Sequence, residues 1–254
     1  MTVVIAVTNQ KGGVGKTTTA VNVAYFLAKQ ANKTLLIDFD PQGNATSGLG
    51  IDKQTLQSTM TDVMIETKLL SDIIIATEHK NLFLAPTTSH LANTEAELAQ
   101  ANRRFGRLKN AIDNLNGYDY IIIDNPPSLS LLTVNGLIAA RYVLLPVQAE
   151  FYALEGLGQL LESMKLIRKS MNPTLELLGV LPTMTDSRTT LSKQVQEEII
   201  KHFPGKVFKT TIPRNIRLAE APSHGLPIGA YDRFSKGSRA YKSLTKEVID
   251  RVSQ

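Results

Sequence analysis

The chain has 254 residues, of which 43% are hydrophobic, so it is long enough to bury one large core. It contains no cysteine, which excludes disulfides, thiolate catalysis and cysteine-ligated zinc or iron–sulfur sites. The formal net charge is +5, and residues 183–254 hold the excess, with thirteen Lys or Arg against seven Asp or Glu. This asymmetry favours an anionic partner, either nucleic acid or a membrane surface, although charge alone is equally compatible with an ordinary solvated surface.

The first apolar run, Val3–Val7, lies almost at the start of the chain. It is too short to span a membrane and lacks the charged start and cleavage site of a signal peptide. We therefore expect a cytoplasmic protein. We also expect one domain over residues 1–254, without an N-terminal helix-turn-helix extension. A DNA-binding helix-turn-helix would need more residues before the first strand than this sequence has.

Short apolar runs alternate with stretches of helical period, a pattern typical of βα units. Runs of Ile, Val and Leu without polar alternation indicate strands buried on both faces, so we predict an α/β fold with a doubly wound, mostly parallel sheet and helices on both faces. The segment 46–80 has weak periodicity and is interpreted as a pair of short helices. The predicted strands are Val3–Val7, Leu35–Ile37, Leu82–Ala85, Tyr120–Ile123, Tyr142–Val147, Leu177–Leu181 and Val207–Ile212.

Two stretches between these strands show one apolar helix face. The first contains Val21, Ala24, Tyr25 and Ala28, and the second contains Leu157, Leu160, Leu161, Met164 and Ile167. In both, the apolar residues recur at the three- and four-residue spacing of an α-helix. Ligands of such folds bind at the carboxyl ends of the strands, so the residues after each apolar run are the candidates for a site.

A glycine-rich turn follows the first strand and leads into a helix that begins near Lys16, the context in which a phosphate-binding loop is credible. The glycines let the backbone curl so that successive N–H groups point inward, and Lys16 adds an ammonium for the terminal phosphates. Thr17 is expected to give its hydroxyl to Mg²⁺, and Thr18 is expected to bond a phosphate oxygen. The predicted nucleotide-binding residues here are Lys11, Gly12, Gly13, Val14, Gly15, Lys16, Thr17 and Thr18.

This loop departs from the common phosphate-loop pattern. Gln10 stands where that pattern has glycine, and Lys11 precedes the paired glycines. A lysine there cannot readily fold back onto phosphates already held by Lys16. It can reach across a face-to-face dimer to the partner's ATP and stabilise the charge of the transferred phosphoryl group. The alternative is that Lys11 is a solvated loop charge.

The sequence resembles the deviant Walker A ATPases of the ParA/MinD family, and most closely the chromosome-partitioning members called ParA or Soj. The resemblance covers nearly the whole chain and implies an ATP sandwich dimer, consistent with the reading of Lys11. It rests on Asn9–Thr18, Leu36–Asn44, Ile121–Ser128, Pro146–Gly156 and Ile212–Gly225.

Three aspartates follow predicted strands: Asp38, Asp40 and Asp124. Hydrolysis of a phosphoanhydride needs one carboxylate to orient water and another to hold the shell of Mg²⁺. The resemblance implies that Asp40 orients water and that Asp124 is the Walker B acid, so Lys11, Lys16, Asp40 and Asp124 form the predicted catalytic set. On strand geometry Asp38 is expected to support Mg²⁺ or a backbone turn, which makes Thr17, Asp38 and Asp124 the predicted metal residues.

For the base of ATP, the resemblance implies contacts with Pro213 and Asn215 after the last predicted strand. An asparagine side chain can both donate to and accept from a purine edge, while proline offers a flat apolar surface. The resemblance also implies that ATP is hydrolysed slowly and that this slow step times the cycle. ATP-bound dimers bind a large surface, called the track here, and a ParB/Spo0J-type centromere-binding protein triggers hydrolysis and release of the dimer from it.

Two tracks are open within this family: nucleoid DNA for the partitioning proteins, and a membrane for the division regulator MinD. A membrane-binding protein of this kind needs a terminal helix with bulky apolar residues on one face and Lys and Arg on the other. In residues 235–254 the apolar face has side chains of the size usual in a protein core, and acidic residues lie among them. The basic excess of the last third suits non-specific double-stranded DNA. Arg188 and Arg217 match family positions associated with DNA contact.

Other classes are disfavoured by the same features. Reductases with a related loop use cysteines for an iron–sulfur cluster, and this chain has none. Bacterial tyrosine kinases of related loop type usually carry a C-terminal tyrosine cluster, whereas only Tyr231 and Tyr241 occur after residue 152. A biosynthetic ligase-like enzyme would require a substrate pocket for which the sequence offers no candidate residues. We therefore expect an ATP-dependent, nucleoid-associated partitioning ATPase, with a MinD-like membrane ATPase as the alternative.

Overall fold

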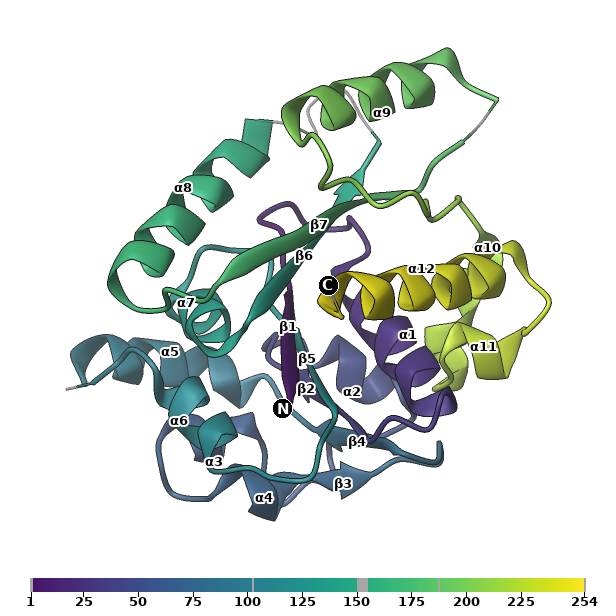
Figure 1. Cartoon of the computed structure of the whole chain (residues 1–254). Helices are drawn as coiled ribbons and strands as arrows, with labels where there is room; N and C mark the ends of the chain where they lie inside the picture. Colours follow the sequence, from purple (N-terminus) through teal and green to yellow (C-terminus); the bar gives the residue numbers. More distant parts are fainter. Residues whose placement is uncertain (1, 102, 150–154, 187, 254) are drawn as a thin grey trace.

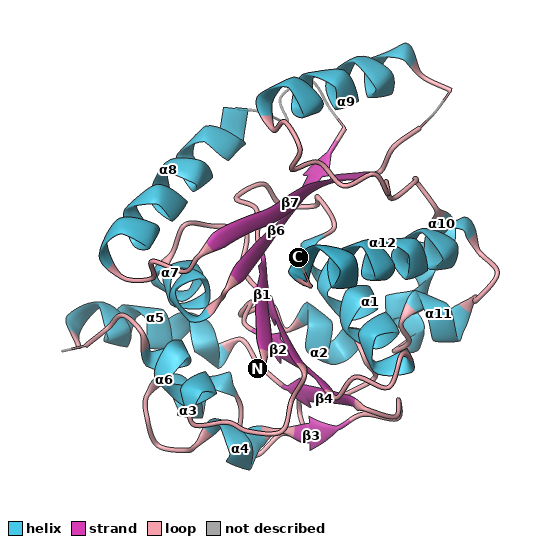
Figure 2. Ribbon diagram, viewed as in Figure 1, coloured by secondary structure: helices cyan, strands magenta, loops and turns pink. Residues whose placement is uncertain are grey.

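The computed structural model of the chain describes residues 2–101, 103–149, 155–186 and 188–253. Within them, seven strands form one sheet in the order β3-β4-β2-β5-β1-β6-β7 (Figure 2). All neighbouring strands are parallel except β3 and β4. The strands are β1 (Val3–Val7), β2 (Thr34–Asp38), β3 (Ile75–Ala76), β4 (Leu82–Ala85), β5 (Tyr120–Asp124), β6 (Tyr142–Gln148) and β7 (Glu176–Thr183).

Helices cover both faces of this sheet, which confirms the predicted fold class. Along β5, Ile121 and Ile123 belong to one core and Ile122 to the other, so successive side chains enter opposite layers. The helices are α1 (Lys16–Lys29), α2 (Asn44–Gly48), α3 (Met60–Met64), α4 (Leu70–Ile73), α5 (His90–Gln100), α6 (Arg107–Asp113), α7 (Leu131–Ala139), α8 (Glu155–Ser170), α9 (Thr190–His202), α10 (Ile216–Glu220), the 3₁₀ helix η2 (Ala221–His224), α11 (Ile228–Tyr231) and α12 (Lys236–Val252).

The two layers differ in which part of the chain builds them. One core receives side chains from α3 to α9, and the other receives them from α1, α2, η2, α11 and α12. Figure 1 accordingly shows α7 and α8 on one side of the sheet and α1 and α12 on the other. None of the helices within the described residues is long and apolar enough to cross a membrane.

Helix α1 lies beneath α12 and is buried on nearly all sides. The four residues predicted to form its inner face are buried, and so are the intervening Ala20, Val23 and Leu27. The helix has this extra burial because α12 packs along it, and the two side chains Thr19 and Tyr241 meet at 3.1 Å between their hydroxyl oxygens. The predicted apolar stripe of 235–254 is therefore core packing on α1.

One predicted strand is wrong. Val207–Ile212 runs beside β7, where only two isolated bridges form among the described residues: one joins Val207 to Val180 and the other joins the next residue, Pro213, to Thr185. Between the bridges, the backbone N–H groups of Lys209 and Thr210 donate to the carboxylate of Glu247 on α12, at 2.9 and 3.0 Å. Because a side chain takes these donors, no continuous ladder with β7 can form.

Two smaller differences concern the segment 46–80 and the strand ends. The expected short helices are present as α3 and α4, but the two-residue edge strand β3 was not predicted, since two residues carry no periodic signal. The strands β2, β5, β6 and β7 each extend past the predicted apolar run by one or more residues. At the carboxyl ends of β2 and β5 the added residue is a buried aspartate, Asp38 or Asp124.

Candidate nucleotide site

Three parallel strands end together at one edge of the sheet. Asp124, the last residue of β5, pairs in register with Val7 of β1 on one side and with Asp38 of β2 on the other. The carboxyl ends of β1, β5 and β2 are therefore side by side, with β5 between the other two. The phosphate loop leaves from β1, so the strand order brings the ends of the strands that carry Asp38 and Asp124 to the start of this loop.

The loop between β1 and α1 has the backbone that its glycines predict. Gly13 and Gly15 have φ values of +74° and +86°, a region that side chains with a Cβ rarely adopt. Gly15 is the N-cap of α1, and its carbonyl accepts the N–H of Thr19 at 2.9 Å. Thr17 and Thr18 thus lie in the first turn of α1, where the helix N-terminus favours an anion.

Lys16 is buried at the base of this loop, with 7% of its surface exposed. Its ammonium donates to the main-chain carbonyl of Lys11 at 3.0 Å. Burial lowers the pKa of Lys16, and the charges of Asp124 and Asp40 act in the opposite direction. The side chain is therefore held between the phosphate loop and the carboxylates, as expected for a lysine that binds terminal phosphates.

The side chain of Lys11 is exposed, but its backbone is held on both sides. Its carbonyl accepts from Lys16, and its N–H donates to the side-chain oxygen of Asn9 at 3.0 Å. The sequence thus places two lysines of different environment in one loop: Lys16 is buried beside carboxylates, and Lys11 is at the surface.

Asp38 and Asp124 are fully buried neighbours. Burial raises the pKa of Asp38 to about 7, although the hydroxyl and N–H of Thr46 donate to its Oδ2 at 2.6 and 2.7 Å. Burial also raises the pKa of Asp124 well above its usual range, and the charge of Asp38 adds to the effect. The hydroxyl of Thr17 lies close enough to Asp124, and the N–H of Asp40 close enough to Asp38, to act in the opposite direction on these pKa values. Neither contact has the geometry of a full hydrogen bond, so both oxygens of Asp124 and Oδ1 of Asp38 lack a well-formed partner among the described residues.

Asp40 is held by the loop that follows β2. Its Oδ1 accepts the N–H of Gln42 at 3.0 Å, and its carbonyl accepts the N–H of Gly43 at 2.8 Å. Only 7% of its surface is exposed, and its charge acts on Lys16. The hydrogen bonds of this turn use Oδ1 and the main-chain carbonyl of Asp40, and they do not involve its Oδ2.

The carboxylates of Asp124 and Asp38 can supply some, but not all, of the oxygen ligands that a divalent cation such as Mg²⁺ needs. The unpartnered oxygens of Asp124 and Asp38 are suitable ligands, and a nearby cation would remove the cost of burying them without partners. Within the described residues there is no group of three or more His, Cys, Asp or Glu that could hold a metal ion alone. Such a cation would need oxygens from Thr17, phosphate or water, which is how Mg²⁺ usually binds.

Pro213 and Asn215, predicted to contact the base, lie beside the phosphate loop. They line a cavity of about 330 Å³ together with Gly15, Thr18 and Tyr241. The segment is held to the end of β7 because Thr185 donates its N–H to Ile212 and accepts that of Arg214. Asn215 also caps α10, since its side chain accepts the N–H of Arg217 at 3.0 Å.

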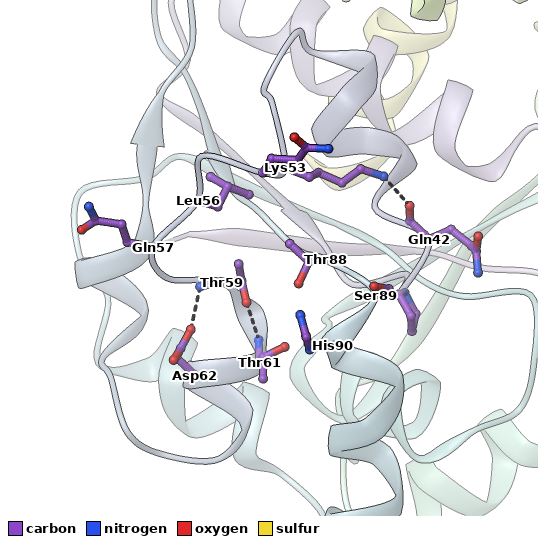
Figure 3. Close-up of a pocket in the computed structure, with 12 residues that line it drawn as sticks. Gln42, Lys53, Leu56, Gln57, Thr59, Thr61, Asp62, Thr88, Ser89 and His90 are labelled. Atoms are coloured by element: carbon purple, nitrogen blue, oxygen red, sulfur yellow. Dashed lines mark hydrogen bonds between the residues drawn. The ribbon is translucent and has the colours of Figure 1, made fainter.

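A larger cavity, of about 720 Å³, opens beside the loop that follows β2, between Gln42, Lys53, the start of α3 and the start of α5. Figure 3 shows Lys53 lying across it, with its ammonium on the carbonyl of Gln42 at 2.9 Å. The far wall, Thr88 to His90, is joined to the site through Thr87, whose N–H donates to Thr46 at 3.1 Å. Thr46 in turn binds Asp38, so the cavity borders the loops of both aspartates.

Comparison with known proteins agrees with this geometry. Residues 2–177 match the family model described as an AAA domain. The chain is 53% identical to the sporulation initiation inhibitor protein Soj of Bacillus subtilis over 246 residues, which cover 96% of this chain and 97% of Soj. It is 47% identical to the chromosome partitioning protein ParA of Myxococcus xanthus, over 98% of this chain and 88% of ParA.

The chain belongs to the Soj/ParA family of chromosome-partitioning ATPases. Among solved structures, it is similar to cobyrinic acid a,c-diamide synthase from Mycobacterium smegmatis with bound ADP and magnesium. That match has a TM-score of 0.88 at 37% identity and covers 100% of this chain and 96% of the other. Identity to the partitioning proteins is higher than to this biosynthetic enzyme.

The two predicted DNA contacts of this Soj/ParA chain lie on separate surface elements, and both are ion-paired. Arg188 binds Asp186 through two nitrogens, at 2.9 and 2.7 Å. Arg217 donates to Glu220 at 2.9 Å and lies 3.7 Å from Asp232. The side chain of Arg188 is 86% exposed and that of Arg217 is 51% exposed, so a phosphate could reach either guanidinium group.

Several residues that shape the site were not predicted. Asn9, Thr46 and Thr183 are buried polar residues whose partners lie far away in sequence or on another loop. Thr183 donates to the carbonyl of Val14 at 2.9 Å across 169 residues. No spacing pattern reports such contacts. In the quoted motif Pro146–Gly156, residues 150–154 lie outside the described residues.

Proposed function

We propose that this chain is an ATP-dependent dimerising switch of the Soj/ParA type that binds double-stranded DNA non-specifically and serves chromosome or plasmid segregation. The whole chain, residues 1–254, acts in this proposal as one domain. ATP and Mg²⁺ are its cofactors, and a ParB/Spo0J-type centromere-binding protein stimulates its slow hydrolysis. The observation that carries the proposal is the pair of lysines in one loop, with Lys16 buried beside carboxylates and Lys11 exposed at the rim.

In this mechanism different residues bind the phosphates, the cation, the attacking water and the base. The N–H groups of the loop 11–18 and the ammonium of Lys16 bind the phosphates, and Thr18 bonds one of their oxygens. Asp124, Asp38 and Thr17 hold the cation, which supplies charge neutralisation when bound. Asp40 orients the attacking water. Pro213 and Asn215 contact the base.

Lys11 then makes the site depend on a second subunit. Its side chain lies at the surface of the loop, while its main-chain carbonyl accepts from Lys16, so in this proposal the ammonium of Lys11 extends away from its own phosphate site and toward a partner's nucleotide. A lysine acting in trans stabilises the charge of the transferred phosphoryl group, as an arginine finger does. ATP binding thereby becomes coupled to dimerisation, and ADP, which lacks the terminal phosphate, does not support the dimer.

DNA is the favoured track. Two copies of the basic last third lie on one dimer, so ATP would control affinity for phosphates through avidity. Arg188 and Arg217 are the proposed contacts, and their ion pairs are weak enough at the surface to be exchanged for DNA phosphates. The MinD-like alternative needs an apolar helix face for lipid. In α12 that face, with Tyr241, Leu244 and Val248, is buried in the core.

The two tracks can be separated directly. The protein is co-sedimented with DNA and, in parallel, with liposomes containing anionic lipid, each with ATP and with ADP. We expect sedimentation with DNA and ATP only, and loss of binding as salt rises. Binding to liposomes and not to DNA would replace the partitioning proposal with the membrane alternative. Localisation at the nucleoid follows from the expected result.

A further inference from the structure

The side chain of Asn9 joins the phosphate loop to a neighbouring strand. Asn9 follows β1 by two residues and has only 4% of its surface exposed. Its Nδ2 donates to the main-chain carbonyl of Pro146 in β6 at 2.7 Å. Its Oδ1 accepts the N–H of Lys11 at 3.0 Å. One buried amide thus binds the backbone of Lys11 and the end of β6 at the same time.

The consequence is that the main chain of Lys11 is fixed although its side chain is exposed. Its N–H is held by Asn9 and its carbonyl by the ammonium of Lys16, at 3.0 Å in both cases. A lysine side chain has four flexible methylene groups, so its ammonium reaches a defined point only if the backbone that carries it is held. Asn9 supplies the link of this backbone to the sheet.

A second tether of the loop is separate from the first. Thr183, at the end of β7, donates its hydroxyl to the carbonyl of Val14 at 2.9 Å. Val14 lies three residues beyond Lys11, in the part of the loop that is proposed to bind phosphates. The loop is therefore attached to β6 near Lys11 and to β7 near Val14, and each attachment can be removed alone.

We propose that Asn9 is the positioning residue that directs Lys11 toward the nucleotide of the second subunit. The inference rests on the proposed ATP-dependent dimer and goes beyond it, because it assigns the direction of the lysine to a residue that binds no nucleotide. Asn9 acts only through Lys11. Binding of the phosphates within one subunit depends instead on the part of the loop held by Thr183.

Two substitutions separate the two contacts of Asn9. Asn9→Ala removes both. Asn9→Asp is nearly the same size and still accepts the N–H of Lys11, but it cannot donate to Pro146, and its charge repels that carbonyl. Since the link to β6 is what fixes the loop to the sheet, both variants are expected to lose dimerisation to a similar extent. Thr183→Val, which keeps the shape of the side chain, is the matched control.

The measurements are dimerisation with ATP and Mg²⁺ by light scattering over a range of protein concentrations, and ADP affinity by titration with a fluorescent ADP analogue. For Asn9→Ala and Asn9→Asp, the concentration for half-dimerisation rises about tenfold, as expected when a buried hydrogen bond is lost. Their ADP affinity stays within about twofold of the parent. Thr183→Val shows the opposite pattern, with weaker ADP binding and parental dimerisation at saturating ATP.

A double substitution tests whether Asn9 acts through Lys11. Dimerisation tightens the apparent affinity for ATP by linkage, so the parent binds ATP more tightly than Lys11→Ala. Adding Asn9→Ala to Lys11→Ala leaves the apparent ATP affinity unchanged, because no side chain remains to be directed. A purely structural role for Asn9 would weaken ATP binding further in the double variant.

The outcomes are distinct. The inference about Asn9 is overturned if either Asn9 variant dimerises like the parent, if ADP affinity falls by the same factor as dimerisation, or if the double variant loses more ATP affinity than Lys11→Ala. If the parent itself does not dimerise with ATP and Mg²⁺, the proposed function fails and the inference fails with it.

Discussion

The ammonium of Lys16 donates a hydrogen bond of 3.0 Å to the main-chain carbonyl of Lys11, so the two lysines of the phosphate loop are in direct contact. An ammonium has three protons, so Lys16 can keep this contact while it donates to the charged oxygens of a bound phosphate, which are stronger acceptors. Removal of Lys16 therefore removes both the phosphate ligand and the contact that closes the loop.

Lys16→Ala is expected to lower ATP affinity by about 100-fold or more, because hydrogen bonds to charged groups contribute about 1.5–3 kcal/mol each. Isothermal titration with ATP and Mg²⁺ measures the effect. Lys29→Ala, at the other end of α1, is the control and keeps parental affinity. Tight ATP binding by Lys16→Ala would contradict the assignment of the phosphate loop.

Lys11→Ala is expected to give a monomer that still binds ATP, since the side chain is exposed and lies outside the contacts of Lys16 with its own loop. Sizing by light scattering with ATP and Mg²⁺ checks this. Lys80→Ala is the control, because Lys80 is exposed just before β4, at the opposite edge of the sheet. Dimerisation of the Lys11 variant at parental concentrations would remove its role in trans.

Asp40→Ala is expected to retain ATP binding and dimerisation but to lose hydrolysis by about 100-fold, so that ATP dimers persist on DNA. Phosphate release and DNA co-sedimentation are the measurements. Asp52 offers a matched control, because it makes the same local contact with the residue two positions on: Gln54 donates to Asp52 as Gln42 donates to Asp40. Asp52 is exposed, and Asp52→Ala is expected to hydrolyse ATP normally. Parental turnover by Asp40→Ala would exclude Asp40 from the reaction.

Arg217→Glu is expected to abolish DNA binding at moderate salt while leaving ATP-dependent dimerisation intact. Mobility shifts and light scattering measure the two effects. Arg141→Glu is the control, since Arg141 is another exposed arginine paired with a glutamate at 2.9 Å, at the amino end of β6. If both variants bind DNA equally well, the surface around α10 does not carry the contact.

Glu247→Gln tests the hydrogen bonds by which the Glu247 carboxylate holds the segment beside β7. Burial acts to raise the pKa of Glu247, but the donors Lys209 N–H, Thr210 N–H and Arg251 outweigh it and lower the pKa. A carboxyl with a lowered folded-state pKa contributes stability above its unfolded pKa and loses it as pH falls through the folded value. We expect the variant to be about 1–2 kcal/mol less stable than the parent at neutral pH, with the difference shrinking in acid.

Urea unfolding at neutral pH and at acidic pH measures this difference. Asp250→Asn on the same helix is the control, because Asp250 is exposed, and it is expected to change stability little at either pH. A stability difference for Glu247→Gln that stays constant down to acid pH would show that the ionised carboxylate is not what the segment binds.

The sequence predicted the parts of this molecule that depend on local pattern. Apolar runs located β1, β2, β4, β5, β6 and β7, and the glycine spacing located the phosphate loop, because burial on both faces and positive φ angles select residue types directly. Val207–Ile212 has the composition of a strand. It is not one, since Glu247, which lies 38 residues after Lys209 and 37 after Thr210, takes the backbone donors of these two residues.

Within the candidate site, the residues that follow from local pattern could also be predicted from the sequence. Asp38 and Asp124 were expected at one edge because parallel strands share a direction, and they pair in register there. Asn9 and Thr183 could not be found in this way. Their partners, Pro146 and Val14, are 137 and 169 residues away, and only the folded sheet brings them together.

The meeting of Thr19 with Tyr241 joins the first helix of the chain to the last. During synthesis the phosphate loop and α1 leave the ribosome long before α12 exists. Until the final residues emerge, the face of α1 that later packs on α12 stays open to water, and the hydroxyl of Thr19 lacks this partner. The phosphate loop and α1 are thus made before α12, but their packing is completed only when α12 has been made.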